Sequence, residues 1–81
     1  MYFVYILKTS GNTLYIGQTG DLERRFKEHR EKSARSAKYI KYFDSFELMY
    51  YEEFETRSEA MKREAQLKKL SKLQKEAIIT R

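Results

Sequence analysis

The first part of the chain carries the residue types that β-strands favour. The segment from Met1 to Lys8 alternates and is rich in Tyr, Phe, Val and Ile, which predicts a strand. Turn-forming residues follow at Thr9-Ser10-Gly11-Asn12, and strand character resumes from Thr13 to Gly17. Together these segments predict a β-hairpin.

The alternation returns once in the middle of the chain. Phe46, Leu48 and Tyr50 alternate with their neighbours, and this pattern predicts a third strand. Between the hairpin and this strand, Asp21 is a good N-cap for a helix from Leu22 to about Lys32. A weaker basic helical segment follows over residues 33–43.

Two capping patterns mark helices in the last third of the chain. Thr56 with Glu59 predicts a capping box for a helix that ends near Leu70, and Ser71 with Gln74 predicts a second box for a terminal helix. The expected order of elements is β-β-α-(α)-β-α-α. We therefore expect a single α+β domain over residues 1–81, in which helices flank a small three-stranded β-sheet.

The composition fits one small domain and excludes several classes of protein. Of the 81 residues, 41% are hydrophobic and 15% aromatic, which is enough apolar material for one core although 36% are charged. The lack of Cys excludes disulfides and thiolate metal sites and fits a reducing compartment. The longest apolar run, Tyr2 to Leu7, is too short to span a membrane, and the charged segment of a signal peptide is missing. We expect a soluble, cytoplasmic protein with no membrane partner.

Charge is distributed in three blocks along the chain. The net charge is +5, but residues 24–41 carry a local charge of +6, residues 42–59 carry −5, and residues 60–81 carry +5. Two basic blocks on either side of an acidic one are typical of a surface that follows a phosphate backbone, although solvated helix faces give the same pattern. Under the first interpretation Arg30, Lys38 and Lys41 would contact the phosphates of DNA, and RNA would fit the same charges.

The helix expected from Leu22 places two polar residues on its apolar side. At about 100° per residue, Arg25 and His29 fall on the face of Leu22, whereas Arg24 faces solvent. A cation and an imidazole on a face that meets the sheet are costly unless they find partners, so their position favours a functional site. The alternatives are a structural ion pair for Arg25 and a buried, hydrogen-bonded His29.

The helix after Thr56 singles out one carboxylate in the same way. Glu64 falls within the arc that contains Met61 and Leu67, while Glu59 lies at the helix start, where capping explains it. A lone buried carboxylate near phenols and an Arg suits a hard cation such as Mg²⁺, which accepts one or two carboxylates and keeps several waters. The alternative is a buried Glu paired with a basic residue.

These residues stand in a recognisable order. Tyr5 and Tyr15 lie on the two hairpin strands, in Phe3-Val4-Tyr5 and Tyr15-Ile16-Gly17, and the run Asp-Leu-x-x-Arg-x-x-x-His follows from Asp21 to His29. With Glu64 later in the chain, the set resembles the GIY-YIG endonuclease superfamily, most closely its small stand-alone bacterial members of the YhbQ type. The likeness extends over essentially the whole chain and includes a second distinctive stretch at residues 63–70. It implies the GIY-YIG fold and an endonuclease that hydrolyses phosphodiester bonds in DNA, with little sequence specificity, in DNA repair or recombination.

The resemblance also implies a role for each residue. Tyr5 and Tyr15 would help activate the attacking water, one of them as phenolate or proton relay, and Arg25 would hold the scissile phosphate. His29 would orient or deprotonate a tyrosine. Glu64 would bind Mg²⁺ or Mn²⁺, which would stabilise the leaving oxygen.

The resemblance gives a role to one glycine, and the chain departs from the family pattern in two other respects. Gly17 would let the backbone turn tightly beside the substrate. Phe3 stands where the first motif has Gly, and no Asn follows Asn12, although larger members carry an Asn near the end of the core. A catalytically weak or inactive nucleic-acid-binding module is therefore the alternative function. Selectivity would come from a branched or single-stranded substrate or from a helper subunit.

Overall fold

The structure is a computed structural model that describes residues 1–30 and 46–80. In chain order it contains the following elements: β1 (Tyr2–Thr9), β2 (Leu14–Thr19), α1 (Leu22–Arg30), β3 (Phe46–Phe54), α2 (Arg57–Lys68) and α3 (Lys72–Ile79). This order confirms the expected α+β arrangement, and the helical segment expected over residues 33–43 lies outside the described residues. No helix of the described ranges is long and apolar enough to cross a membrane.

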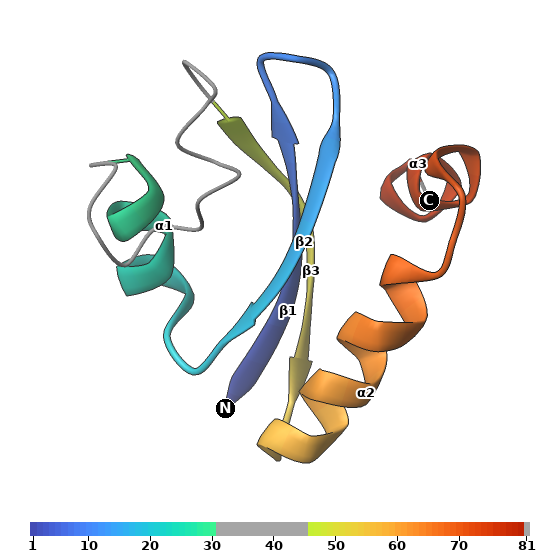
Figure 1. Cartoon of the computed structure of the whole chain (residues 1–81). Helices are drawn as coiled ribbons and strands as arrows, with labels where there is room; N and C mark the ends of the chain where they lie inside the picture. The colour runs from blue at the N-terminus through green and yellow to red at the C-terminus, as the bar shows by residue number, and fades with distance from the viewer. Residues whose placement is uncertain (31–45, 81) are drawn as a thin grey trace.

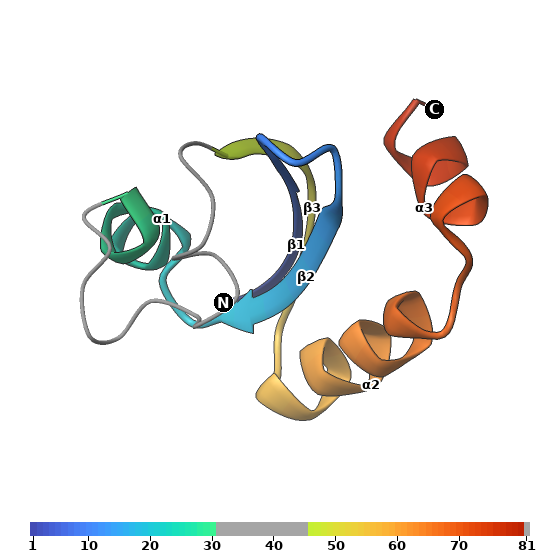
Figure 2. The same cartoon turned by 45° about the horizontal axis from the view of Figure 1, so that its top comes forward.

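The three strands form one antiparallel sheet in the order β2-β1-β3. Helix α1 lies on one face of the sheet, and α2 and α3 lie on the other (Figure 1, Figure 2). The central strand β1 is covered on both faces, and residues 4–7 are at most 2% exposed. Burial on both faces explains why this strand is a nearly continuous apolar run.

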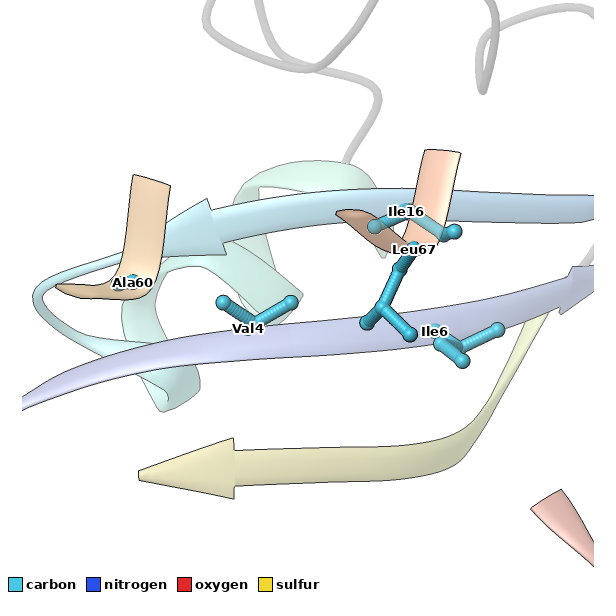
Figure 3. Close-up of a cluster of buried hydrophobic side chains, with 5 residues drawn as sticks. All are labelled: Val4, Ile6, Ile16, Ala60 and Leu67. Atoms are coloured by element: carbon cyan, nitrogen blue, oxygen red, sulfur yellow. The ribbon is translucent and has the colours of Figure 1, made fainter. Parts of the chain in front are cut away.

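The core on the α2 face joins two strands to one helix. It consists of five buried residues that pack together: Val4, Ile6, Ile16, Ala60 and Leu67 (Figure 3). Ala60 and Leu67 are the buried residues of α2 and lie about two turns apart, so this helix meets the sheet along a narrow seam. Met61, which was expected in the same arc, is 49% exposed. The apolar face of α2 is therefore narrower than the sequence predicts.

A β-bulge in β3 changes which of its side chains face α2. The pairing with β1 shifts by one residue between Leu48 and Tyr50, so Met49 is an extra residue in the strand. Leu48 packs on the α1 face with Phe46, whereas Tyr50 packs on the α2 face. A uniform alternation would have placed all three hydrophobic side chains on one face.

Side-chain caps fix the start of each helix. Asp21 Oδ1 accepts a hydrogen bond from the backbone N–H three residues on, at 3.1 Å, and Ser71 with Gln74 forms the complete capping box that was predicted. Thr56 caps α2 by accepting from the Glu59 backbone N–H at 3.2 Å. The Glu59 carboxylate, however, accepts a hydrogen bond from the hydroxyl of Thr56 at 2.9 Å, and not from the backbone N–H of Thr56 as a complete capping box requires. The box predicted at α2 is thus half formed.

Candidate active site

Tyr5 and Tyr15 lie side by side on the α1 face of the sheet. Tyr5 is in the central strand and Tyr15 in the outer strand β2, and their ring centroids are 6.4 Å apart with the ring planes inclined at 45°. Tyr5 is 2% exposed, whereas Tyr15 is half-buried. The structure therefore brings together the two phenols that the sequence singled out, and they differ in their access to solvent.

Gly17 lies directly opposite Tyr5 in β2 and makes room for its ring. A Cβ atom on Gly17 would be 2.5 Å from Tyr5 Oη and 2.7 Å from Tyr5 Cζ. Gly17 lies within β2, and none of the glycines in the described ranges has a positive φ. The prediction of a tight backbone turn at Gly17 is therefore wrong. The absence of a side chain at Gly17 admits the phenol instead.

Arg25 reaches the phenols from α1. Its guanidinium is hydrogen-bonded to Tyr5, and its Nη1 lies 3.6 Å from Glu28 Oε1. The Asp21 cap sets the phase of the helix, so that the Arg25 side chain is 24% exposed while Arg24 points into solvent. Arg25 thus has the partners that a cation on this face requires.

The surroundings of Tyr5 determine its charge. Burial raises the pKa of Tyr5 to about 12, and the hydrogen bond from Arg25 opposes this rise. Burial disfavours the Arg25 cation, but its bond to Tyr5 and its proximity to Tyr15 and Glu28 outweigh burial and raise its pKa. At neutral pH, Tyr5 is therefore a neutral phenol beside a permanent cation, and it holds the guanidinium in place.

The ring of Phe3 lies away from this cluster. It packs edge-to-face against Tyr51 of β3, with ring centroids 6.1 Å apart. The ring of Tyr5, by contrast, lies over Gly17 of β2. The two rings therefore pack against different neighbouring strands, Phe3 against β3 and Tyr5 against β2.

Glu64 belongs to α2, which packs on the opposite face of the sheet from the phenols. Its negative charge acts on the Tyr5 phenol, and its side chain is 23% exposed, so it is half-buried rather than buried as expected. Its Oε2 lies 3.8 Å from Nζ of Lys68, one turn further along the helix. A contact of this length to a lysine that is 57% exposed is weak, so the carboxylate is available to another cation.

A polar hollow gives solvent access to Arg25. It has a volume of about 550 Å³ and lies between the end of β2 and α1, lined by residues 18–21 and by Arg24, Arg25 and Glu28. The guanidinium therefore faces a space that a ligand can enter.

Four of the predicted site residues fall outside what the structure describes. His29 and Arg30 belong to α1 by their backbone, but their side chains are outside the described part of the chain. Lys38 and Lys41 lie wholly outside the described residues. Their roles stay predictions.

Three charged residues near the cluster were not predicted. Glu28 is three residues from Arg25, and Lys68 is four residues from Glu64, so helical spacing alone is a signal that would have identified both. Lys75 of α3 lines a hollow together with Tyr15. No local pattern signals Lys75, because its place depends on how α3 packs.

The fold and this cluster define a GIY-YIG domain. Residues 1–77 match the family model described as the GIY-YIG catalytic domain. The chain belongs to this family, a nuclease-type fold that implies a nucleic-acid substrate.

Within the family, the chain is similar to small proteins from bacteria and archaea. It is 41% identical to the UPF0213 protein VNG_2274C of Halobacterium salinarum, over 96% of this chain and 99% of that protein. It is 44% identical to the UPF0213 protein LMOf2365_0181 of Listeria monocytogenes, over 96% of this chain and 85% of that protein. The solution NMR structure of the UPF0213 protein BH0048 from Bacillus halodurans is 34% identical, with a TM-score of 0.62, and the match covers 99% of this chain and 84% of that one. These matches confirm the fold and the family that the sequence predicts.

Proposed function

We propose that this protein is a metal-dependent endonuclease that hydrolyses phosphodiester bonds in DNA with little sequence specificity, in DNA repair or recombination. The observation that carries the proposal is the convergence of Tyr5, Tyr15 and Arg25 on one face of the sheet, with the charge of Glu64 acting on the same phenol from α2. A surface that only binds nucleic acid has no need of a buried phenol that holds a half-buried guanidinium. Such clusters of perturbed groups are typical of catalytic sites.

Arg25 is the group that binds the scissile phosphate. Its planar guanidinium suits two phosphate oxygens at once, and Tyr5 and Glu28 hold it in position before substrate arrives. A donor held in this way stabilises the charge that develops on the phosphoryl oxygens in the transition state.

Tyr15 is the phenol that orients the attacking water. Tyr5 is buried and neutral, so the half-buried Tyr15 is the phenol with access to solvent. As the water oxygen bonds to phosphorus and the bond to the leaving oxygen breaks, the proton of the water passes to Tyr15. His29, which the family resemblance implies orients or deprotonates a tyrosine, would take the phenol's own proton, and the leaving oxygen departs as an oxyanion that solvent protonates.

The residues at Glu64 fit a hard divalent cation such as Mg²⁺ or Mn²⁺. Glu64 supplies one half-buried carboxylate, and residues 1–30 and 46–80 contain no group of three His, Cys, Asp or Glu that could hold a metal. A single carboxylate, with water and phosphate oxygens as the other ligands, is an arrangement that Mg²⁺ accepts. When bound, such a cation stabilises negative charge on the phosphate oxygens.

A cleavage assay on labelled substrates tests this function. The panel contains duplex, single-stranded, flap and junction DNA and the matching RNAs, each with Mg²⁺, Mn²⁺ or EDTA. We expect cleavage with either metal and none in EDTA. Arg25→Ala should lower turnover on the order of a hundredfold, since loss of a preorganised donor typically costs about 3 kcal/mol.

Arg24→Ala is the matched control for this assay. It removes the same charge one position away, from an exposed side chain that lines the same hollow, so it should weaken substrate binding but retain turnover close to that of the wild type at saturating substrate. If folded Arg25→Ala cleaved as well as the wild type, cleavage would not depend on this cluster, and the cluster would belong to a nucleic-acid-binding module rather than to a nuclease site.

A further inference from the structure

A shallow hollow lies at the outer edge of β2, next to the candidate active site. It has a volume of about 220 Å³ and is lined by five residues from three elements: Leu14, Tyr15, Ile16, Lys68 and Lys75. Tyr15 belongs to the phenol pair, and Lys68 is the ion-pair partner of Glu64. The hollow therefore shares Tyr15 with the candidate active site.

The side chains of Lys68 and Lys75 both line this small hollow, and carboxylates neutralise their positive charges only weakly. Lys68 is 57% exposed and has only the 3.8 Å contact with Glu64. Lys75 is half-buried, and within the described ranges it has no carboxylate partner. Two like charges at one hollow repel each other, and an anion bound between them would relieve that repulsion. A phosphate group suits this position.

A third lysine of the same region has a structural role that keeps α3 in place. Lys72 Nζ donates to the backbone carbonyl of Asn12 in the hairpin loop at 2.7 Å, and it also lies 4.0 Å from Glu76. This link connects α3 to the loop between β1 and β2. It therefore holds Lys75, on the next turn of α3, near the edge of β2.

The β2 side of the hollow is apolar. Ile16 belongs to the core cluster on the α2 face, Leu14 packs against that cluster, and both line the hollow. The half-buried side chain of Leu14 beside two lysines can contact a nucleobase while the lysines contact a phosphate. The volume of about 220 Å³ lies below the roughly 300 Å³ of typical small-molecule sites, so the hollow would hold only part of a nucleotide.

We propose that this hollow binds one unpaired nucleotide next to the scissile phosphate. The phosphate of that nucleotide lies between Lys68 and Lys75, and its base lies against Leu14. A base within a duplex is stacked on its neighbours and is not free to take this position. The proposal rests on the proposed nuclease function and names its substrate class, which is nucleic acid with a single-stranded segment beside the cleavage site.

Binding measurements in EDTA test the proposal without requiring cleavage. Fluorescence anisotropy compares the wild type with Lys75→Gln and with Lys62→Gln, using labelled single-stranded DNA and blunt duplex DNA. Lys62 is exposed on α2 and lines a different hollow, so Lys62→Gln loses the same charge elsewhere. We expect Lys75→Gln to weaken single-strand binding roughly fivefold and duplex binding less than twofold, and Lys62→Gln to weaken both less than twofold.

An abasic scan of the single strand tests the contact with the base while leaving the protein unchanged. One abasic site is moved along the labelled strand, and we expect affinity for the wild type to fall several-fold at one position. The same strand should show no such position with Lys75→Gln. Equal losses for both lysine variants, or an abasic profile without a minimum in the wild type, would overturn the proposal.

The results separate this inference from the proposed function. Wild-type cleavage together with full single-strand affinity of Lys75→Gln would leave the nuclease standing and remove the nucleotide subsite. The expected binding pattern without cleavage on any substrate would keep the subsite and remove the nuclease.

Discussion

The phenol of Tyr5 lies directly over Gly17, the residue opposite it in the sheet, with no room for a side chain between them. The hydroxyl that holds Arg25 therefore depends on the absence of a single methyl group on the neighbouring strand. This relationship explains why glycine is required at a position whose backbone is ordinary β-strand.

The first prediction is that Gly17→Ala displaces Tyr5. A Cβ at 2.5 Å from Tyr5 Oη forces the ring to move in a site that is 2% exposed, and such overpacking typically costs about 1–3 kcal/mol. Urea denaturation should show this loss, and cleavage should fall with it. Gly20→Ala is the control, because its Cβ would be 3.5 Å from Tyr2, an ordinary contact. Equal effects of the two variants would contradict the steric explanation.

The second prediction concerns the ionisation of Tyr5. Burial raises its pKa to about 12, so NMR of ring-labelled tyrosine should place its midpoint near that value. An unfolded tyrosine ionises near pH 10, so the contribution of Tyr5 to stability is complete below about pH 10 and is lost as pH rises through about 12. The total loss is roughly 2–3 kcal/mol, at 1.36 kcal/mol per pKa unit.

Tyr5→Phe supplies the comparison for this second prediction. The difference in free energy of unfolding between wild type and Tyr5→Phe should be constant below about pH 10 and should change only above it. A Tyr5 midpoint near neutral pH would show instead that the buried phenol is ionised in the resting site.

Much of the fold followed from local pattern. The hairpin was predictable because alternation and turn residues are local signals, and Asp21 and Ser71 begin their helices as expected. The place of Arg25 followed from helical spacing once the start of α1 was known.

The remaining features depend on contacts between distant segments. The bulge at Met49 moves Tyr50 to the opposite face, and no local signal marks a one-residue insertion in a strand. The space over Gly17 is filled by the Tyr5 ring from another strand. The sequence alone does not show this contact, so Gly17 was predicted to permit a tight backbone turn instead. Met61 is exposed because α2 contacts the sheet along a narrow seam. The apolar arc predicted from the sequence of this helix was wider than that seam.

The third prediction is that Glu64 is the carboxylate on which metal-dependent cleavage depends. Glu64→Gln keeps the shape of the side chain but removes the charge that a hard cation needs, so cleavage with Mg²⁺ should vanish while DNA binding in EDTA persists. Glu59→Gln is the control and should cost about 1 kcal/mol of stability at most, because that side chain only accepts from the Thr56 hydroxyl. Equal loss of cleavage in both variants would show that α2 presents a different residue to the metal.

The last prediction concerns how α2 presents Glu64. Arg63 forms a two-point contact with Glu52 of β3, with Nε to Oε1 at 2.9 Å and Nη2 to Oε2 at 3.1 Å, and Tyr50 also donates to this carboxylate. Arg63 and Glu64 lie about 100° apart around the helix, on either side of the seam formed by Ala60 and Leu67. A helix that contacts the sheet along so narrow a seam can rotate about its own axis unless a second contact, beside the seam, prevents the rotation. We expect the Arg63–Glu52 pair to resist rotation of α2 and so to fix the position of Glu64.

Arg63→Met should accordingly lower stability and metal affinity together. Removal of one partner leaves the Glu52 charge half-buried, at a cost of roughly 1–3 kcal/mol in urea denaturation. Mn²⁺ affinity, measured by electron paramagnetic resonance titration of the folded protein, should fall several-fold although Glu64 is intact. Lys62→Met, on the exposed side of the same helix, should change neither quantity appreciably. The double variant Glu52→Arg with Arg63→Glu restores the pair in reverse and should recover most of the Mn²⁺ affinity. Full affinity in Arg63→Met would mean that the seam alone fixes the rotation of α2.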